Sequence, residues 1–422
     1  MDTNGWDIVF AADIGVINKS LQSNTASLIE NFDFNEQGYD AKGTFGTWSI
    51  AAGGSGKNLA LNIELKSSLL TPPGQSSIDI SGLIVQLGVA LQLLPSPSSP
   101  GGQTLTFNFK SVGGSPSPDN GVVSPNGVID PDHRLTPLQE RVVAIAVATC
   151  LVNNASKVSY VFANITPSGA NATPWLMPHQ SSYCYAPATG EGASLAILSM
   201  TSDGPSNAPL KVDHSLLCQP GDAGLAIAPW IFLRNVFVPG LANAWGVAAS
   251  LFSVDNVGHL SNNGTIGLPS VSKAGETYYP KINSLTASVQ ADHVALSVSG
   301  SCDMGMNISM TFNGSSNIGI QFDPISQKIS MTVLGTPTFS KNVDIPWYDH
   351  LLDIISVGVA EIVLQVTTNV IGNELGNGIS QMTGASNISS ASSNIVSWGG
   401  RGGFSPNTAG LSGALWLKGP VK

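Results

Sequence analysis

The sequence has few charged residues. Asp, Glu, Lys and Arg make up 10% of its 422 residues, whereas they make up about 25% of an average soluble domain. Basic residues are the scarcer kind, because 17 Lys and Arg face 27 Asp and Glu for a net charge of −10. The chain has no basic run, so binding to nucleic acid by neutralisation of phosphates is excluded as its function.

Cysteines are also few, and the common catalytic motifs are missing. The four cysteines, at positions 150, 184, 218 and 302, are far apart and form no C-x-x-C pair. This spacing predicts neither a zinc site nor a dense disulfide framework, and we interpret the four as reduced, buried thiols. The sequence has no G-x-S-x-G or H-E-x-x-H motif. We therefore expect no catalytic residues, no metal and no cofactor.

Transmembrane helices are not expected. The apolar run 142–152 is too short to cross a bilayer, and the run 354–371 carries Glu361 near its middle, where charge is costly. The chain starts with polar and acidic residues and shows no signal-peptide pattern.

Glycine, proline and apolar residues are abundant. The chain has 46 Gly and 26 Pro, and 42% of its residues are hydrophobic. Frequent turns between apolar runs are typical of a protein rich in β-strands with a large core. Alternating apolar residues predict one-face-buried antiparallel strands at 59–65, 85–93 and 105–109.

Helical periodicity appears at two places in the first half of the chain. The apolar stripe of 6–21 predicts an amphipathic helix, which contains Trp6, Phe10, Ile14 and Ile17. A helix from Pro137 to about Asn153 is predicted by Thr136 as N-cap and Gln139 as its capping-box partner.

The second half repeats the order of helix, strands and helix. We predict a helix at 239–254, alternating strands at 281–333, and a long final helix at 346–382. The apolar face of that final helix contains Trp347, Leu351, Ile355 and Ile362.

This order predicts an α+β fold of two tubular units, residues 1–205 and 206–422, each a long helix wrapped by a highly curved antiparallel sheet. A helix that does not fill the concave side of such a sheet leaves an elongated apolar groove. The residues named above on the first and final helices are the candidates for lining it, although simple core packing explains each of them individually.

The segment 229–238 concentrates aromatic and branched residues around one arginine. It is interpreted as a buried strand or, alternatively, as an apolar edge that contacts lipid or a protein partner. The candidate interface residues are Trp230, Phe232, Arg234 and Phe237.

Two other patterns are weak as functional signals. The glycine-rich stretch 53–58 lacks the Gly and the Ser or Thr of a phosphate-binding loop, because Ala51 and Asn58 occupy those positions, and we interpret it as a hairpin turn. Four histidines directly follow an aspartate, as in Asp292-His293. Neighbouring residues of a strand point to opposite faces, so these pairs are not expected to form dyads.

The opening residues resemble a known family. NGWDIVF at 4–10, followed by VINK at 16–19 and Leu21, is similar to the start of the clostridial forty-seven-kilodalton accessory proteins, which are encoded with OrfX proteins beside botulinum neurotoxins. The resemblance implies the tubular lipid-binding (TULIP) fold and no catalytic site. For Trp6, Asp7 and Asn18, which match the family, we favour structural roles: a helix anchor, an acid near a helix N-terminus and a side chain bonded to backbone.

We therefore expect a non-enzymatic protein of an insecticidal or other bacterial toxin cluster that binds lipid or another hydrophobic small molecule in an apolar groove. The alternative is a scaffold or chaperone of a toxin complex with a filled core. Other proteins of the cluster and a membrane surface are the further partners to consider. The expected location is the bacterial cytoplasm, or outside the cell after release without a classical signal.

Overall fold

The computed structural model describes residues 1–97, 99, 101–114, 120–166, 174–187, 192–202, 207–217, 221–273, 276–304, 308–344, 395–399 and 403–421. They form two compact units. The larger unit comprises Ile8–Leu225, Ala391–Ser405 and Lys418–Lys422, and the smaller unit comprises Met1–Asp7, Ala226–Ser390 and Pro406–Leu417. The boundary that the sequence predicts, between 205 and 206, falls in a segment outside the described residues.

The larger unit is built on a sheet with the strand order β2-β3-β4-β6-β7-β10-β23, to which β5, β8 and β9 are attached. The strands β11-β12-β1-β13 lie side by side in a second sheet. The bounds are β1 Ile8–Asp13, β2 Asn31–Glu36, β3 Tyr39–Ser55, β4 Asn58–Thr71, β5 Ile78–Asp79, β6 Ile84–Pro95, β7 Gln103–Asn108, β8 Ser111–Val112, β9 Val122–Ile129, β10 Val161–Ile165, β11 Gln180–Ala186, β12 Ser194–Met200, β13 Asp222–Ile227 and β23 Val396–Trp398, with helices α1 Ile14–Ser23 and α2 Pro137–Asn153.

Residues at alternate positions of the strands form the hydrophobic core of this unit. Along β4, Leu59, Leu61, Ile63 and Leu65 are at most 1% exposed, while the residues between them are only half-buried. β4 pairs antiparallel with β3 and with β6, as the alternation predicts. The stretch 53–58 is the hairpin turn between β3 and β4, and Ser55 pairs with Asn58 across it.

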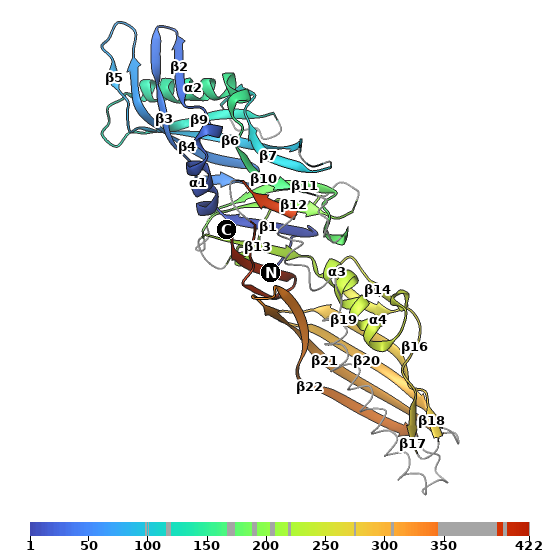
Figure 1. The fold of residues 1–422 in the computed structure, drawn as a ribbon. Helices are drawn as coiled ribbons and strands as arrows, with labels where there is room; N and C mark the ends of the chain where they lie inside the picture. The colour runs from blue at the N-terminus through green and yellow to red at the C-terminus, as the bar shows by residue number, and fades with distance from the viewer. Residues whose placement is uncertain are drawn as a thin grey trace. The chain divides into compact units, whose positions relative to one another are not determined.

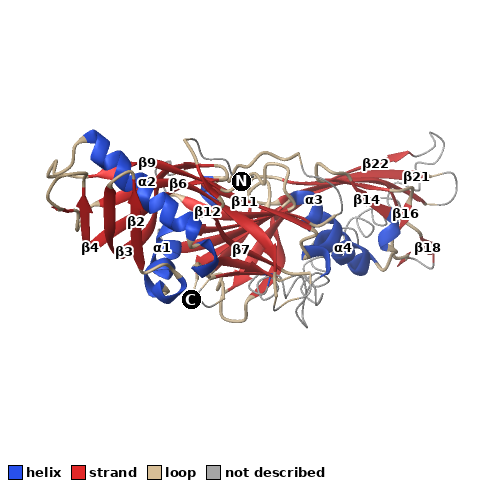
Figure 2. Ribbon diagram, turned by 90° about the horizontal axis from the view of Figure 1, so that it is seen from above, coloured by secondary structure: helices blue, strands red, loops and turns tan. Residues whose placement is uncertain are grey.

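Helix α2 confirms the start predicted from the capping box. The side-chain oxygen of Thr136 accepts from the Gln139 backbone N–H, and the Gln139 side chain accepts from the Thr136 backbone N–H at 2.8 Å. Figures 1 and 2 show α2 lying across the strands of the larger sheet, where it contacts β9, β2 and β6.

The first predicted helix is wrong over its first half. Residues 8–13 form strand β1, which pairs antiparallel with β12, and the helix begins only at Ile14. Every residue of β1 is buried. A strand covered on both faces has no polar alternation, so its apolar run looks like part of a helical stripe. Asp13 ends the strand and caps the helix, because its carboxylate accepts from the Gly15 N–H at 2.8 Å.

The smaller unit contains a sheet with the order β14-β15-β19-β20-β21-β22 and β16 paired to β19, and a separate hairpin of β17 and β18. The bounds are β14 Phe252–Val254, β15 His259–Asn262, β16 Ile266–Gly267, β17 Val271–Lys273, β18 Glu276–Tyr278, β19 Lys281–Val289, β20 Val294–Asp303, β21 Ser309–Asp323, β22 Lys328–Asp344, β24 Thr408–Leu411 and β25 Leu415–Pro420, with helices α3 Pro229–Phe232, η5 Leu233–Phe237 and α4 Val238–Trp245. The alternating strands predicted at 281–333 are confirmed, and each pairs antiparallel with the next.

Two predictions in this unit are corrected. Residues 229–237 are helical rather than a strand, and η5 is a π-helical turn between two α-helices. Pro229 occupies the first turn of α3, which suits its fixed φ. The helix predicted to reach Val254 ends at Gly246, which has a left-handed φ of 64° and terminates α4.

Several expectations fall outside the described residues. They include the final helix at 346–382, with Trp347, Leu351, Ile355 and Ile362, and the cysteine at position 218. The fold that is described is mixed and sheet-rich, and its sheets are antiparallel apart from the short pair β8–β9.

Candidate functional site

The four candidates from the first predicted helix do not form one stripe. Trp6 is grouped with the smaller unit, whereas Phe10, Ile14 and Ile17 belong to the larger unit. Phe10 projects from β1, and the other two lie on α1. All four are buried, at 1–9% exposure. The prediction that they share one face of a single helix is therefore wrong. The chain forms strand β1 up to Asp13 and helix α1 after it.

Phe10 lies in an aromatic cluster beside a very small cavity. Its ring centroid is 5.1 Å from that of Phe404 in an edge-to-face contact and 6.0 Å from that of Trp398 in a stacked one. The cavity has a volume of about 10 Å³, and its lining includes Phe10, Ile197 and Val396. A volume near 10–15 Å³ holds about one water molecule, whereas ligand pockets measure about 300–1,000 Å³. This part of the predicted groove is packed.

Asn18 joins α1 to strand β3. Its side-chain NH2 donates to the Ile50 carbonyl at 3.0 Å, and its side-chain oxygen accepts from the Ile50 N–H at 2.8 Å. The role expected from the family resemblance, an Asn bonded to backbone, is thus confirmed. Asp7 is 1% exposed and precedes strand β1 rather than the first predicted helix, and its carbonyl accepts from the N–H of Ala228, the N-cap residue of α3, at 2.9 Å.

Of the four interface candidates, two are buried, Trp230 is half-buried and Arg234 is exposed. Phe232 and Phe237 are completely buried in the core, so they cannot form a surface edge. Arg234 is exposed, stacks over the Trp230 ring with its guanidinium carbon 4.8 Å from the ring centroid, and donates to the Val254 carbonyl at 3.1 Å. These contacts join the π-helical turn to β14, which is a structural role.

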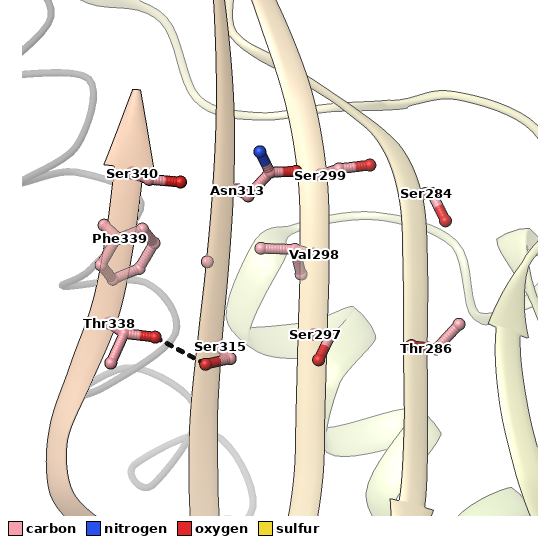
Figure 3. A pocket seen from close by; sticks show the side chains of 11 residues that line it. Ser284, Thr286, Ser297, Val298, Ser299, Asn313, Ser315, Thr338, Phe339 and Ser340 are labelled. Carbon is pink, nitrogen blue, oxygen red and sulfur yellow. Dashed lines mark hydrogen bonds between the residues drawn. The ribbon is translucent and has the colours of Figure 1, made fainter. Parts of the chain in front are cut away.

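An exposed row of hydroxyl groups crosses six strands of the seven-stranded sheet of the smaller unit. The strand registers align one residue from each strand, and every one is exposed. This hydroxyl row consists of Ser253, Ser261, Thr286, Ser297, Ser315 and Thr338. The Oγ atoms of Ser253 and Ser261 are 3.1 Å apart, and Ser315 Oγ is 2.6 Å from Thr338 Oγ1, the contact dashed in Figure 3.

A second polar row lies beside the first. It is aligned by register through Ser284, Ser299, Asn313 and Ser340, and Figure 3 shows these side chains next to those of the hydroxyl row. Two hollows of about 410 and 490 Å³ lie over this face, and both are lined by Thr286 and Ser297. Sequence reasoning missed this surface. The signal was present as Ser, Thr and Asn at alternate positions of the strands, but their alignment depends on register.

One of the Asp-His pairs lies in a hairpin turn. Asp292 and His293 are in contact, with Oδ1 and Nδ1 2.6 Å apart, contrary to the expectation that adjacent residues diverge. They lie in the turn between β19 and β20, where the alternation of a strand does not apply. Within the described part of the chain, no group of three or more His, Cys, Asp or Glu side chains could hold a metal ion.

Three of the four cysteines are described, and each is a free, buried thiol as expected. Burial raises the pKa of Cys150, and it raises the pKa values of Cys184 and Cys302 to about 11. A high pKa suppresses the reactive thiolate, so these three behave as core residues. Among the described helices, none has the length and apolarity needed to span a membrane.

The chain is similar to proteins of one family along most of its length. A family model described as OrfX-like, Protein OrfX2/OrfX3/P47, matches residues 3–333. Protein P47 of Clostridium botulinum (strain Kyoto / Type A2) is 27% identical over 299 residues, which cover 68% of this chain and 69% of that protein.

Solved structures of P47 share the fold. P47 from Clostridium botulinum A2 superposes with a TM-score of 0.79 at 23% identity, covering 100% of this chain and 98% of that one. P47 of Clostridium botulinum E1 gives a TM-score of 0.75 at 21% identity, covering 99% of each chain. The match over residues 3–333, together with the shared fold, establishes that this chain belongs to the OrfX-like family of OrfX2, OrfX3 and P47 proteins.

Proposed function

We propose that this protein is a non-enzymatic accessory protein of a bacterial toxin gene cluster, and that it acts by binding other proteins of that cluster through its surface. Membership of the OrfX-like family supports the accessory role. The observation that favours surface binding over transport of a ligand is the packing around Phe10, where the cavity has a volume of only about 10 Å³.

Lipid binding in a groove is the second candidate. It rests on the resemblance to tubular lipid-binding proteins. In this proposal the protein has two tubular units, and in each a curved antiparallel sheet wraps a long helix. Half of the proposed groove residues belong to the final segment at 346–382, outside the described residues. The packing of Phe10, Ile14 and Ile17 argues against an open channel at the first segment.

The two candidates are distinguished by organic extraction of the purified full-length protein, followed by mass spectrometry. A scaffold with a filled core releases no lipid in stoichiometric amount. Val396→Phe, which adds volume beside the Phe10 cavity, is then expected to lower the free energy of unfolding by about 1–3 kcal/mol through overpacking. One acyl lipid per chain, displaced in Val396→Phe with little loss of stability, would instead establish the lipid-binding function.

Partner binding requires its own measurement. The full-length protein is mixed with each of the other proteins encoded in its own gene cluster, and complexes are sought by size-exclusion chromatography with light scattering. At least one stable complex is expected. If none forms and lipid is extracted, the scaffold proposal is wrong.

A further inference from the structure

Strand β22 forms a long edge of the smaller unit. It has 17 residues, whereas most strands have about 3–10. Within the described residues it pairs only with β21, so it is the outermost strand of its sheet (Figure 1). The strand at the opposite edge, β14, has only three residues. The backbone groups along the outer side of an edge strand have no partner in the sheet, and they form a template on which a further strand can pair.

A bulge divides β22 into two halves of equal length. Residues 335–337 lie opposite the single residue Ser316 of β21. Gly335, at the start of this bulge, has a left-handed φ of 71°, which suits glycine. The regular ladders on the two sides are 328–334 and 338–344, with seven residues each. The middle residue of the bulge is therefore also the middle residue of the strand.

This symmetry selects one register in which β22 can pair with the same strand of a second copy. Two antiparallel strands related by a two-fold axis form both seven-residue ladders only if their bulges meet on the axis. In any other register, the bulge of one strand lies against a ladder of the other. Residues 328–334 of one copy then lie opposite 338–344 of the second copy, and Thr336 lies on the axis. Because the bulge adds two residues, an even number, the two halves keep the same alternation of faces.

The charged ends of the strand fit this register. Lys328 lies opposite Asp344 of the second copy, and the reverse pair forms at the other end of the interface. Both side chains are exposed. Lys328 lies across from Asp323 on β21, but no ion pair joins Lys328 or Asp344 to another described residue. The bulge selects the register without reference to charge, so the matching charges are an independent observation.

Side chains along the two ladders are also compatible in this register. On the core face, Val333 lies opposite Phe339 of the second copy, and both are half-buried in the single chain. A β-branched residue beside an aromatic one is a stabilising cross-strand pair. On the other face, Thr332 lies opposite Ser340, and two hydroxyl groups can bond to each other there.

The features of β22 that would oppose pairing are accommodated. Pro337 has no N–H to donate, but it lies in the bulge, where no ladder forms. Lysine on an edge strand usually prevents pairing. Lys341 lies opposite Met331 of the second copy, where its aliphatic stem can cover the methionine while the ammonium group stays in water. Leu334 opposite Thr338 is the other pair of unlike polarity.

We propose that the protein forms a two-fold symmetric dimer in which the β22 strands of two copies pair antiparallel, with Thr336 on the axis. The sheets of the two smaller units then form one continuous sheet, and neither copy keeps a long unpaired edge. The inference does not depend on the proposed accessory function, because it concerns self-association and not the binding of other proteins of the cluster.

Sedimentation velocity of the full-length protein over a dilution series tests this pairing. We expect a concentration-dependent species of twice the 43.6 kDa mass of the chain. Lys328→Asp or Asp344→Lys turns both ion pairs into like-charge contacts, so each variant should raise the dimer Kd about tenfold. The double variant Lys328→Asp/Asp344→Lys restores opposite charges across the interface and should dimerise as the wild type does.

Glu36→Lys is the matched control. Glu36 is exposed on β2, the edge strand of the sheet in the larger unit, and the substitution changes the net charge by the same amount as Asp344→Lys does. Its dimer Kd should equal that of the wild type. Circular dichroism checks that each variant is folded.

The register is tested separately by cysteine cross-linking, which leaves the charges intact and so does not depend on the folding of the charge variants. Thr336 and Ser340 are both exposed. Thr336→Cys places two thiols beside the axis and should give a disulfide-linked dimer under mild oxidation, whereas Ser340→Cys should not. A monomer at every concentration, a double variant as weak as the single ones, or equal cross-linking of the two cysteine variants would overturn the proposal.

Discussion

At the scale of single residues, burial controls the chemistry of the described cysteines. The thiol of Cys184 is 2% exposed and lies 3.1 Å from the Leu210 carbonyl oxygen. Desolvation disfavours the thiolate, and this raises the pKa of Cys184 from 9.0 to about 11.

The raised pKa of Cys184 predicts how the stability of the protein depends on pH. The neutral thiol of Cys184 contributes stability that is fully present below pH 9, where the thiol is also neutral in the unfolded chain. That contribution is lost as the pH rises from 9 towards 11. The unfolding free energy of the wild type should therefore fall more steeply than that of Cys184→Ala over this range, as measured by urea unfolding. Rapid alkylation of Cys184 in the folded protein at pH 8 would contradict the assignment.

Gly43 is required because strand β4 lies too close for a side chain at this position, and not because of an unusual φ. A Cβ atom at this position would lie 2.6 Å from the Cα atom of Ser68 on the neighbouring strand β4. Gly43→Ala should therefore force the strands β3 and β4 apart and lower the free energy of unfolding by about 1–3 kcal/mol. Gly267→Ala is the control, because a Cβ at Gly267 in strand β16 meets nothing within 4 Å. Equal thermal midpoints for the two variants would show that the strands adjust without cost.

At the scale of elements, helix α2 shows how a local signal fixes one end of a helix. Thr136 and Gln139 satisfy each other's backbone N–H groups at the first turn. Thr136→Ala should cost about 1 kcal/mol of stability, whereas Thr136→Ser should cost much less because it keeps the side-chain oxygen. The comparison is made by chemical denaturation. Equal losses in the two variants would mean that the Thr136 methyl group, rather than its oxygen, stabilises the helix start.

At the scale of the whole molecule, neither compact unit is a continuous half of the chain. The smaller unit includes Met1–Asp7, and the Ala228 N–H donates to the Asp7 carbonyl at 2.9 Å. The larger unit includes strand β23 from near the C-terminus, which pairs with β10.

Separate expression of 1–205 and 206–422 should therefore give two chains that do not unfold cooperatively. Each fragment lacks a segment that the other half supplies to its unit, so we expect cooperative unfolding to return only when both are produced together. Calorimetry on each fragment and on the pair measures this. A sharp unfolding transition in fragment 206–422 alone would show that residues 1–7 are not needed by the smaller unit.

Local sequence patterns were enough to predict the strands buried on one face and the helix with a capping box. The alternation of apolar residues at Leu59 and Leu61 is a local pattern, and so is the N-cap at Thr136. Both can be recognised without knowledge of the tertiary structure. The resemblance in the first twenty-one residues also identified the family, whereas the apolar stripe of the same residues predicted a helix where β1 lies.

The other features of the fold depend on contacts between residues that are distant in the sequence. β1 is covered on both faces, and its run of apolar residues is equally compatible with a helix until the pairing with β12 is known. The region 229–238 has the same ambiguity. The hydroxyl row exists because six strands, from Ser253 to Thr338, pair in one register. A shift of one residue in any strand would turn its hydroxyl to the opposite face, and register is set by contacts between residues distant in the sequence.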